Sequence, residues 1–252
     1  ADVKRIQSDI DKFRHITEPC DAGITRIGFT ETYRQGSDYF KDCMKKIGLT
    51  VREDKVGNVY GRLEGSEKNL PAIMSGSHLD TVRCAGAFDG IAGAVCALEV
   101  ARMMKEKGVV LRHPFEVVGT MEEEGTRFGQ VLLGSQFITG VFGGKELDSI
   151  KDPEGNTLRE IRRSYLPRNV CPAYRKDDEI LAFLELHDEQ GPVLEDENID
   201  IGIVEGIVGI SWLTVTVNGF AGHAGTVPMP LRQDAATGAC RLVNSIALHT
   251  SR

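Results

Sequence analysis

Imidazole and carboxylate side chains recur along this chain directly after apolar stretches. They are His78, Asp80, Asp89, the acidic triplet 122–124 and His187. Such ligands suit zinc, manganese, cobalt or nickel, and one carboxylate can bridge two ions about 3.5 Å apart. Asp80, two residues after His78, is placed to orient the His78 ring. The set therefore predicts a two-metal hydrolytic site in which adjacent carboxylates have separate tasks.

Each of these residues also has an ordinary structural explanation. A single histidine in a loop is usually a surface or hydrogen-bonded residue. Asp89 before Gly90 is a common turn, and an acidic run is usually a solvated face. Their shared position favours the metal site, because each is expected to follow a predicted strand and all are expected to converge on one edge of the sheet.

Apolar patterns predict the elements that position these side chains. The expected elements are strands at 59–63, 72–74, 115–119 and 181–186 and a helix at 91–107. This order indicates a crossover unit and an α/β fold with a mostly parallel sheet flanked by helices. His78, the acidic triplet and His187 would then lie beyond the C-terminal ends of strands, where such sheets bind ligands.

Further elements are expected around this unit. Ser37 is the expected N-cap of one helix, and Gly48 marks its end. The expected ranges are helices 2–17, 37–47 and 231–249, a polar helix-and-loop region 143–179, and strands 199–208 and 212–217. The last strand alternates apolar and polar residues, as a half-buried antiparallel strand does.

The change of strand type predicts a domain boundary between residues 209 and 210. The second domain, 210–252, would contain a single strand and a single helix. Such a pair cannot bury its own apolar face. We therefore expect the chain to be a fragment that lacks part of the second domain and also part of the first.

Composition argues against several other classes of protein. The 252 residues, 41% of them hydrophobic, are enough for a buried core. A net charge of −7 with dispersed Lys and Arg argues against a nucleic-acid surface. The chain has neither a signal-peptide core nor an apolar stretch of about eighteen residues, so no membrane association is expected. Its six isolated cysteines are typical of reduced thiols in a cytoplasmic protein.

Five stretches of the chain resemble the hydantoinase/carbamoylase family, which includes N-carbamoyl-L-amino acid hydrolases and allantoate amidohydrolases. These stretches are Gly76–Val82, Phe88–Gly90, Glu122–Phe128, Glu185–Gly191 and Gly222–Met229. The family belongs to the superfamily of two-metal aminoacylases and carboxypeptidases. The resemblance implies an exopeptidase-like catalytic domain over residues 1–209 and the start of a lid or dimerisation domain over residues 210–252.

The resemblance also implies roles for individual residues. His78, Asp89 and His187 would hold one ion, and Asp89 would bridge to a second. Glu124 would bind the second ion, while Glu123 would stay unligated as general base and acid. The peptide bond after Asp89 would be cis, as in the family.

Two more residues match family positions that contact substrate, Gln190 and His223. His223 would reach the active site of a second subunit, which implies a homodimer formed through the lid domain. Without the family, His223 would be explained as an ordinary surface histidine. The implied reaction cleaves the ureido C–N bond of an N-carbamoyl-L-amino acid or of allantoate. It would release ammonia and carbon dioxide and require two divalent ions, zinc or manganese, with cobalt or nickel as alternatives.

Two other functions remain open. One is an aminoacylase or dipeptidase that uses the same metal pair, and the other is an inactive metal-binding fragment. Histidine at position 187, rather than a carboxylate, favours the ureido branch by resemblance. The family's second-ion histidine and the residues that hold the substrate carboxylate have no counterpart before Arg252.

Overall fold

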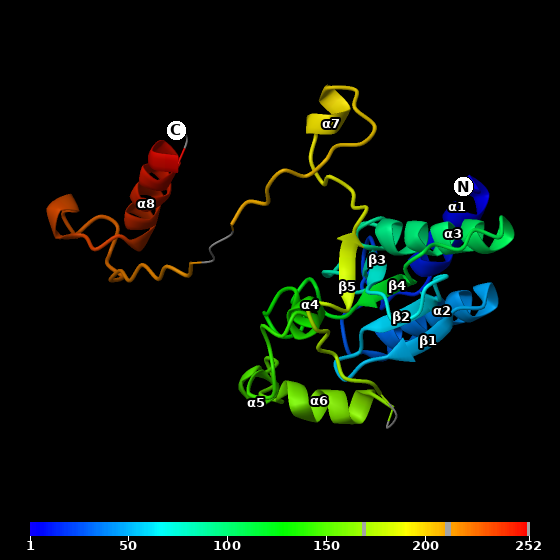
Figure 1. The fold of residues 1–252 in the computed structure, drawn as a ribbon. Coiled ribbons are helices and arrows are strands. Elements are labelled where there is room, and N and C mark those ends of the chain that lie inside the picture. The colour runs from blue at the N-terminus through cyan, green and yellow to red at the C-terminus, as the bar shows by residue number, and fades with distance from the viewer. Residues whose placement is uncertain (168–169, 210–212, 251–252) are drawn as a thin grey trace. The chain divides into compact units, whose positions relative to one another are not determined.

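The computed structural model describes residues 1–167, 170–209 and 213–250, and the chain divides into two compact units (Figure 1). Unit 1 is Ala1–Pro192 and unit 2 is Val193–Arg252. This division falls before the expected boundary at 209/210, because residues 199–209 pair with no strand of unit 1. The assignment of 1–209 and 210–252 to two functional domains stays a prediction.

Unit 1 is built around one mixed sheet of five strands. Their order is β1 (Thr50–Glu53), β2 (Val59–Leu63), β4 (Phe115–Thr120), β3 (Ala72–His78) and β5 (Ile180–Leu184). β3 runs parallel to both β4 and β5, whereas β2 is antiparallel to β1 and β4. The α/β class is confirmed. The expectation of a mostly parallel sheet holds for β4-β3-β5 but is wrong for β1 and β2, since a short polar strand, β1, forms a hairpin with β2.

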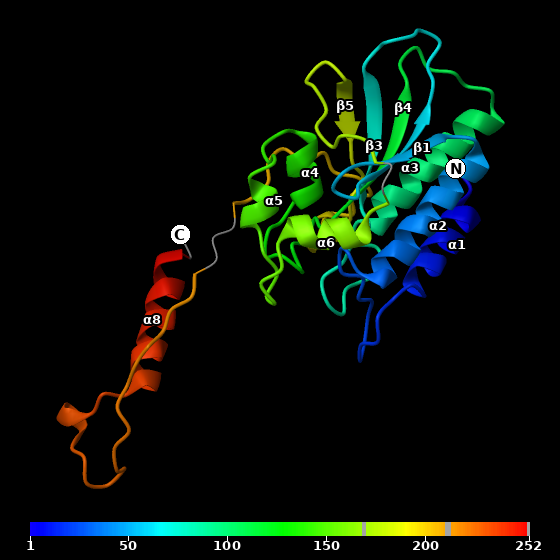
Figure 2. The same ribbon diagram turned by 90° about the horizontal axis from the view of Figure 1, so that it is seen from below.

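Three helices pack on one face of this sheet (Figure 2). They are α1 (Val3–Arg14), α2 (Glu31–Ile47) and α3 (Ile91–Glu106). Successive side chains of a strand point to opposite faces, so Val117 joins the core under these helices while Val118 joins a second cluster. That second cluster includes Ile138, the last residue of α4 (Leu133–Ile138). Both faces of the sheet are therefore covered.

The start of α2 differs from the expected one. Thr30 is the N-cap and accepts a hydrogen bond from the backbone N–H of Tyr33, whereas Ser37 lies buried inside the helix. Gly36 makes room for a buried arginine, because a Cβ atom there would lie 2.9 Å from Cδ of Arg26. The expected end is confirmed, because Gly48 closes the helix at φ 88°.

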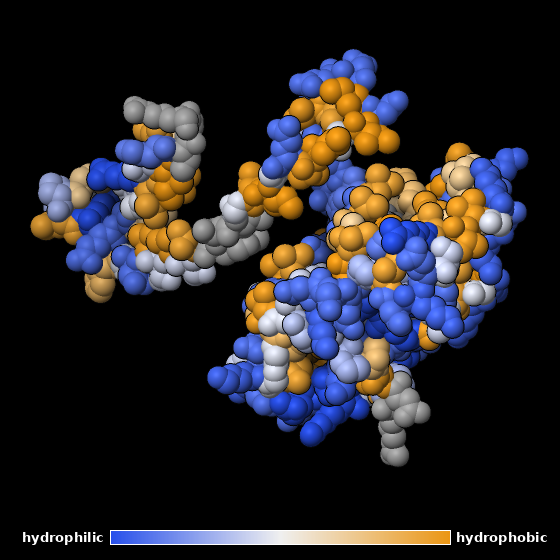
Figure 3. Space-filling model, viewed as in Figure 1, coloured by the Kyte–Doolittle hydropathy of each residue, from blue (hydrophilic) through white to orange (hydrophobic). Residues whose placement is uncertain are grey.

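The remaining elements are short or belong to unit 2. They are α5 (Glu146–Ser149), α6 (Leu158–Tyr165), α7 (Val193–Asp196), the 3-10 helix η1 (Met229–Leu231) and α8 (Ala235–Thr250). The strands expected at 199–208 and 212–217 are absent from the described residues, and Trp212 itself lies outside those residues. These stretches have no described strand to pair with, and Ile203, for example, is 92% exposed. Hydrophobic residues accordingly lie at the surface of the extended part of unit 2 (Figure 3).

A search of the described helices for a membrane span finds no helix that is both long and apolar enough.

Candidate metal centre

The candidate ligands come from the C-terminal ends of the three parallel strands and from the start of α3. His78 is the last residue of β3, the acidic triplet follows β4, and His187 follows β5. Asp89 lies just before α3. Because β3, β4 and β5 run in one direction, their C-terminal ends share one edge of the sheet. The candidate ligands lie together at this edge of the sheet, as expected.

Three side chains form a compact group around one carboxylate oxygen. Nε2 of His78 lies 3.3 Å from Oδ1 of Asp89, and Nε2 of His187 lies 3.4 Å from the same oxygen. The ligand atoms of the three residues all lie within 4.8 Å of one another. The two rings are stacked, with their centroids 5.7 Å apart. This geometry presents two imidazoles and a shared carboxylate to a single point.

The acidic triplet brings two more carboxylates to this group. The carboxyl of Glu124 lies close enough to Asp89 for that group to raise its pKa, and its buried Oε1 has no hydrogen-bond partner among the described residues. Oε2 of Glu123 lies 4.0 Å from Nε2 of His78. A buried oxygen without a partner is costly unless something binds it, and a cation would do so.

Backbone carbonyls fix both histidine rings in the form that a metal needs. Nδ1 of His78 donates to the carbonyl oxygen of Asp80, and Nδ1 of His187 donates to that of Asp188, each at 2.9 Å. A carbonyl oxygen only accepts, so the neutral rings carry their proton on Nδ1 and leave the lone pair on Nε2. Both lone pairs then face Asp89, as a shared metal ion requires.

Asp80 orients His78 in a different way from the one expected. Its carboxylate lies 3.9 Å from Nδ1, too far for a hydrogen bond, and the backbone carbonyl makes that contact instead. The carboxylate accepts hydrogen bonds from the backbone N–H groups of Glu123 and Glu124, each at 3.1 Å. Asp80 therefore links the ring of His78 to the turn that carries both glutamates.

The charges in this group shift the pKa values of its members. Burial alone lowers the pKa of His78, but its hydrogen bond to Asp89 and the charges of Asp80 and Glu123 raise that pKa to about 10. The same hydrogen bond lowers the pKa of Asp89 to about 2. Burial, together with Asp89, raises the pKa of Glu124 to about 7. The raised pKa values of His78 and Glu124 mean that these two groups hold protons where a divalent cation would bind. The imidazole nitrogens and carboxylate oxygens are donors that fit such an ion.

The peptide bond after Asp89 is trans, so the expectation of a cis bond is wrong for this structure. The turn closes instead through Gly90, which has a φ of 66°, a value that glycine adopts without steric cost. A Cβ atom on Gly90 would lie 2.6 Å from three atoms of the His78 ring. Gly90 thus leaves room for the imidazole, and sequence inspection had identified it only as a turn residue.

Sequence inspection missed one buried cation beside the site. The guanidinium of Arg26 is almost fully buried and donates to the backbone carbonyl of Leu79 at 2.6 Å, and to the carbonyls of Phe13 and Ile16. It thus holds the backbone between His78 and Asp80. An arginine in a loop is normally exposed, so nothing in the sequence indicated this position.

The two residues expected to contact substrate lie outside the three-residue group. Gln190 is exposed in unit 1, with a left-handed φ of 54°. His223 is exposed in unit 2, and its Nδ1 accepts hydrogen bonds from the N–H groups of Gly225 and Thr226 at 3.1 and 3.3 Å. The neutral His223 ring therefore carries its proton on Nε2, which is left as a donor.

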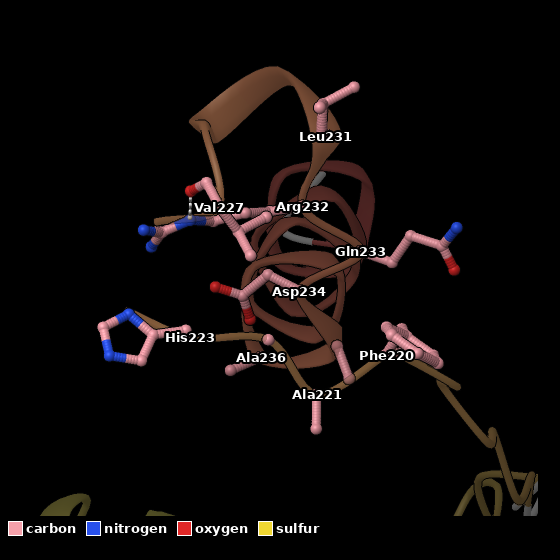
Figure 4. A pocket seen from close by; sticks show the side chains of 12 residues that line it. Phe220, Ala221, His223, Val227, Leu231, Arg232, Gln233, Asp234 and Ala236 are labelled. Atoms are coloured by element: carbon pink, nitrogen blue, oxygen red, sulfur yellow. Dashed lines mark hydrogen bonds between the residues drawn. The ribbon is translucent and has the colours of Figure 1, made fainter. Parts of the chain in front are cut away.

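His223 lines a pocket of about 570 Å³ within unit 2 (Figure 4). Arg232 and Asp234 also line it, and Nε of Arg232 donates to the carbonyl of Val227 at 2.9 Å. The pocket thus presents a hydrogen-bond donor and groups of both charges.

The sequence places this fold and site in a known family. Residues 74–248 match the peptidase family M20/M25/M40. The chain belongs to this family. Within it, the chain is 44% identical over 248 residues to the N-carbamoyl-L-amino-acid amidohydrolase of Paenarthrobacter aurescens, covering 98% of this chain and 60% of that protein. It is 37% identical over 232 residues to the allantoate amidohydrolase of Bacillus subtilis, covering 91% of this chain and 56% of that protein.

A solved structure extends this similarity to the fold. The hydantoinase/carbamoylase family amidase from Burkholderia ambifaria aligns with a TM-score of 0.79 and 33% identity, over 100% of this chain and 62% of its own. The resemblance to the hydantoinase/carbamoylase family is confirmed. The chain spans between 56% and 62% of the length of these relatives.

Proposed function

We propose that this chain carries the metal centre of an amidohydrolase that cleaves the ureido C–N bond of an N-carbamoyl-L-amino acid or of allantoate. The observation that supports this most is the sharing of Asp89. Its carboxylate faces both imidazoles, and it interacts with Glu124, whose pKa it raises. Two neighbouring metal ions are commonly bridged by one carboxylate that lies between the ligands of the first ion and those of the second. The names of the relatives supply the substrate class.

The residues proposed as metal ligands divide between two divalent ions. His78, Asp89 and His187 would hold one ion, and Asp89 with Glu124 would bind the other. Zinc or manganese fits these nitrogen and oxygen donors, with cobalt or nickel as alternatives. Bound ions would polarise the ureido carbonyl and lower the pKa of water.

Glu123 is the proposed general base and acid. Burial raises the pKa of its carboxyl, which makes it a stronger base than an ordinary glutamate. It takes a proton from the water whose oxygen adds to the ureido carbonyl, and returns it to the nitrogen as the C–N bond breaks. Ammonia leaves, and the remaining carbamate separates into carbon dioxide and an amine.

Substrate contacts are proposed for Gln190 and His223. The Nε2–H of His223 would donate to the oxygen that gains negative charge during the addition of water. We propose that this histidine acts on the active site of a second subunit, in a homodimer formed through residues 210–252. Exposed apolar residues of α8, such as Val243 and Leu248, support such an interface.

A cytoplasmic location is proposed on the basis of cysteine chemistry. All six cysteines are free, as is usual in a reducing compartment. Cell fractionation with an antibody to the protein would test this location.

The test of the proposed function is an assay of the chain, and of any longer natural form of it, after loading with zinc or manganese. Ammonia released from an N-carbamoyl-L-amino acid or allantoate is the expected result. Amino acid released only from N-acyl-amino acids or dipeptides would favour the aminoacylase or dipeptidase alternative. Bound metal with no product from any of these substrates would favour an inactive metal-binding fragment.

A further inference from the structure

The first turn of α3 lies against the C-terminal ends of two strands at Gly93. A Cβ atom on Gly93 would lie 2.1 Å from the carbonyl oxygen of Leu186, just past the end of β5, and 3.1 Å from Cβ of Ser77 in β3. The first distance is impossible for a real Cβ atom, and the atom it meets is backbone rather than a flexible side chain. Only glycine allows α3 to come this close to Leu186.

Nothing else in the local structure requires glycine at this position. Gly93 is buried in a regular helix and has no positive φ. Glycine inside a helix is less favourable than alanine. The space for the Leu186 carbonyl is therefore the physical reason for the glycine.

The Leu186 carbonyl is directly coupled to a proposed metal ligand. It belongs to the peptide unit that also contains the backbone nitrogen of His187. The position of this carbonyl therefore fixes where the backbone of His187 begins. The neighbouring strand ends are also joined, because the hydroxyl of Ser77 donates to the carboxylate of Glu185 at 2.5 Å. The contact at Gly93 and this hydrogen bond both act on residues 185–187, directly after β5.

We propose that Gly93 is a positioning residue for His187, and that the contact of α3 with the Leu186 carbonyl holds the His187 ring beside Asp89. This inference rests on the proposed metal centre. A methyl group at position 93 would push the Leu186 backbone away from the helix. His187, whose Nε2 now lies 3.4 Å from Oδ1 of Asp89, would move with it.

The test is the zinc affinity of Gly93→Ala, measured by calorimetry. Changes in the groups that hold a metal ligand typically weaken metal binding about 10- to 100-fold, and we expect a loss in this range. Gly144→Ala is the matched control, because Gly144 has no atom within 4 Å of a Cβ and no positive φ; its zinc affinity should equal that of the wild type.

A double-mutant cycle shows whether Gly93 acts through His187. In a His187→Ala background, Gly93→Ala should cause no further loss of zinc affinity. A full additional loss would overturn the inference, since the substitution would then act on another ligand. Unchanged affinity in Gly93→Ala, with weakened binding in His187→Ala, would also overturn it and leave the metal centre intact. Unchanged affinity in His187→Ala would reject both the metal centre and the role of Gly93.

A second variant covers the case in which Gly93→Ala does not fold. Ser77→Ala removes the hydrogen bond to Glu185 with a small change in volume. It should weaken zinc binding severalfold in the wild-type background and not at all in the His187→Ala background. Wild-type zinc affinity in Ser77→Ala, together with an unfolded Gly93→Ala, would count against the proposal.

Discussion

At the scale of single residues, hydrogen bonds to backbone groups prepare the candidate site. The two imidazoles are held by carbonyls, and the turn of Glu123 and Glu124 is held by Asp80. The sequence could predict which side chains meet, because each follows a strand or opens the adjacent helix. It could not predict the carbonyl contacts, the trans bond after Asp89 or the buried Arg26, since these depend on distances that residue types do not encode.

Replacing Glu123 by glutamine should abolish turnover and leave metal binding intact. The amide cannot take a proton from water, and loss of a general base typically lowers kcat by about 10²- to 10⁴-fold. Zinc content and ammonia release would be measured on the same preparation.

Glu122→Gln is the matched control for this substitution. Burial and the charge of Asp80 raise the pKa of Glu122 to about 7, and its Oε1 accepts from the N–H groups of Arg127 and Phe128. The carbonyl of a glutamine can keep both bonds, so turnover should persist. Equal losses in the two variants would contradict the separate role of Glu123.

Metal binding should release protons, and more of them at lower pH. The pKa of His78 is raised to about 10, so its Nε2 is protonated at neutral pH in the metal-free protein. Glu124, with a pKa of about 7, holds a second proton below that pH. A bound ion displaces both, so we expect release of about two protons at pH 6 and about one at pH 8. Metal affinity should therefore fall as the pH is lowered.

Calorimetry in two buffers with different ionisation enthalpies measures this release. A heat of binding that is independent of the buffer at pH 6 would show that the protons are not held where the structure indicates.

At the scale of elements, apolar patterns predicted the strands and helices that carry the site, and failed where tertiary contacts decide. The stretch at 199–208 has a strand pattern, but a strand also needs a neighbour to pair with. The start of α2 was misplaced at Ser37, whereas Thr30 is the N-cap. Gly36, just before Ser37, makes room for the side chain of Arg26. That contact joins residues ten positions apart and cannot be inferred from local sequence.

The corrected helix start leads to a stability prediction. Thr30→Ala removes the N-cap of α2 and should lower the free energy of unfolding by about 1 kcal/mol. Ser37→Ala is the control, because Ser37 lies within the helix and should cost less. Both values would come from urea titrations. A larger loss of unfolding free energy in Ser37→Ala than in Thr30→Ala would contradict the assignment of Thr30 as the N-cap.

At the scale of the whole molecule, the proposed ligands and the proposed donor to substrate lie in different units. His78, Asp89, Glu124 and His187 belong to unit 1, whereas His223 belongs to unit 2. Metal binding and turnover can therefore be separated by cutting the chain between the units.

A chain ending at Pro192 should bind zinc as tightly as the 252-residue chain and should release no ammonia from a ureido substrate. All five strands of the described sheet and the four proposed ligands lie within unit 1, while the proposed donor His223 would be removed. Circular dichroism would verify the fold, and calorimetry would give the affinity. Weaker zinc binding by a folded truncation would place a further ligand beyond Pro192.

Asp80 contacts both halves of the proposed metal centre, so binding of one ion should affect binding of the other. Its carbonyl holds the ring of His78, a proposed ligand of one ion, and its carboxylate holds the turn that carries Glu124, a proposed ligand of the other. An ion bound by His78 would, through Asp80, also order the turn that carries Glu124. Binding of the second ion would then cost less conformational entropy. Loading should consequently be cooperative, with singly occupied protein scarce throughout a titration.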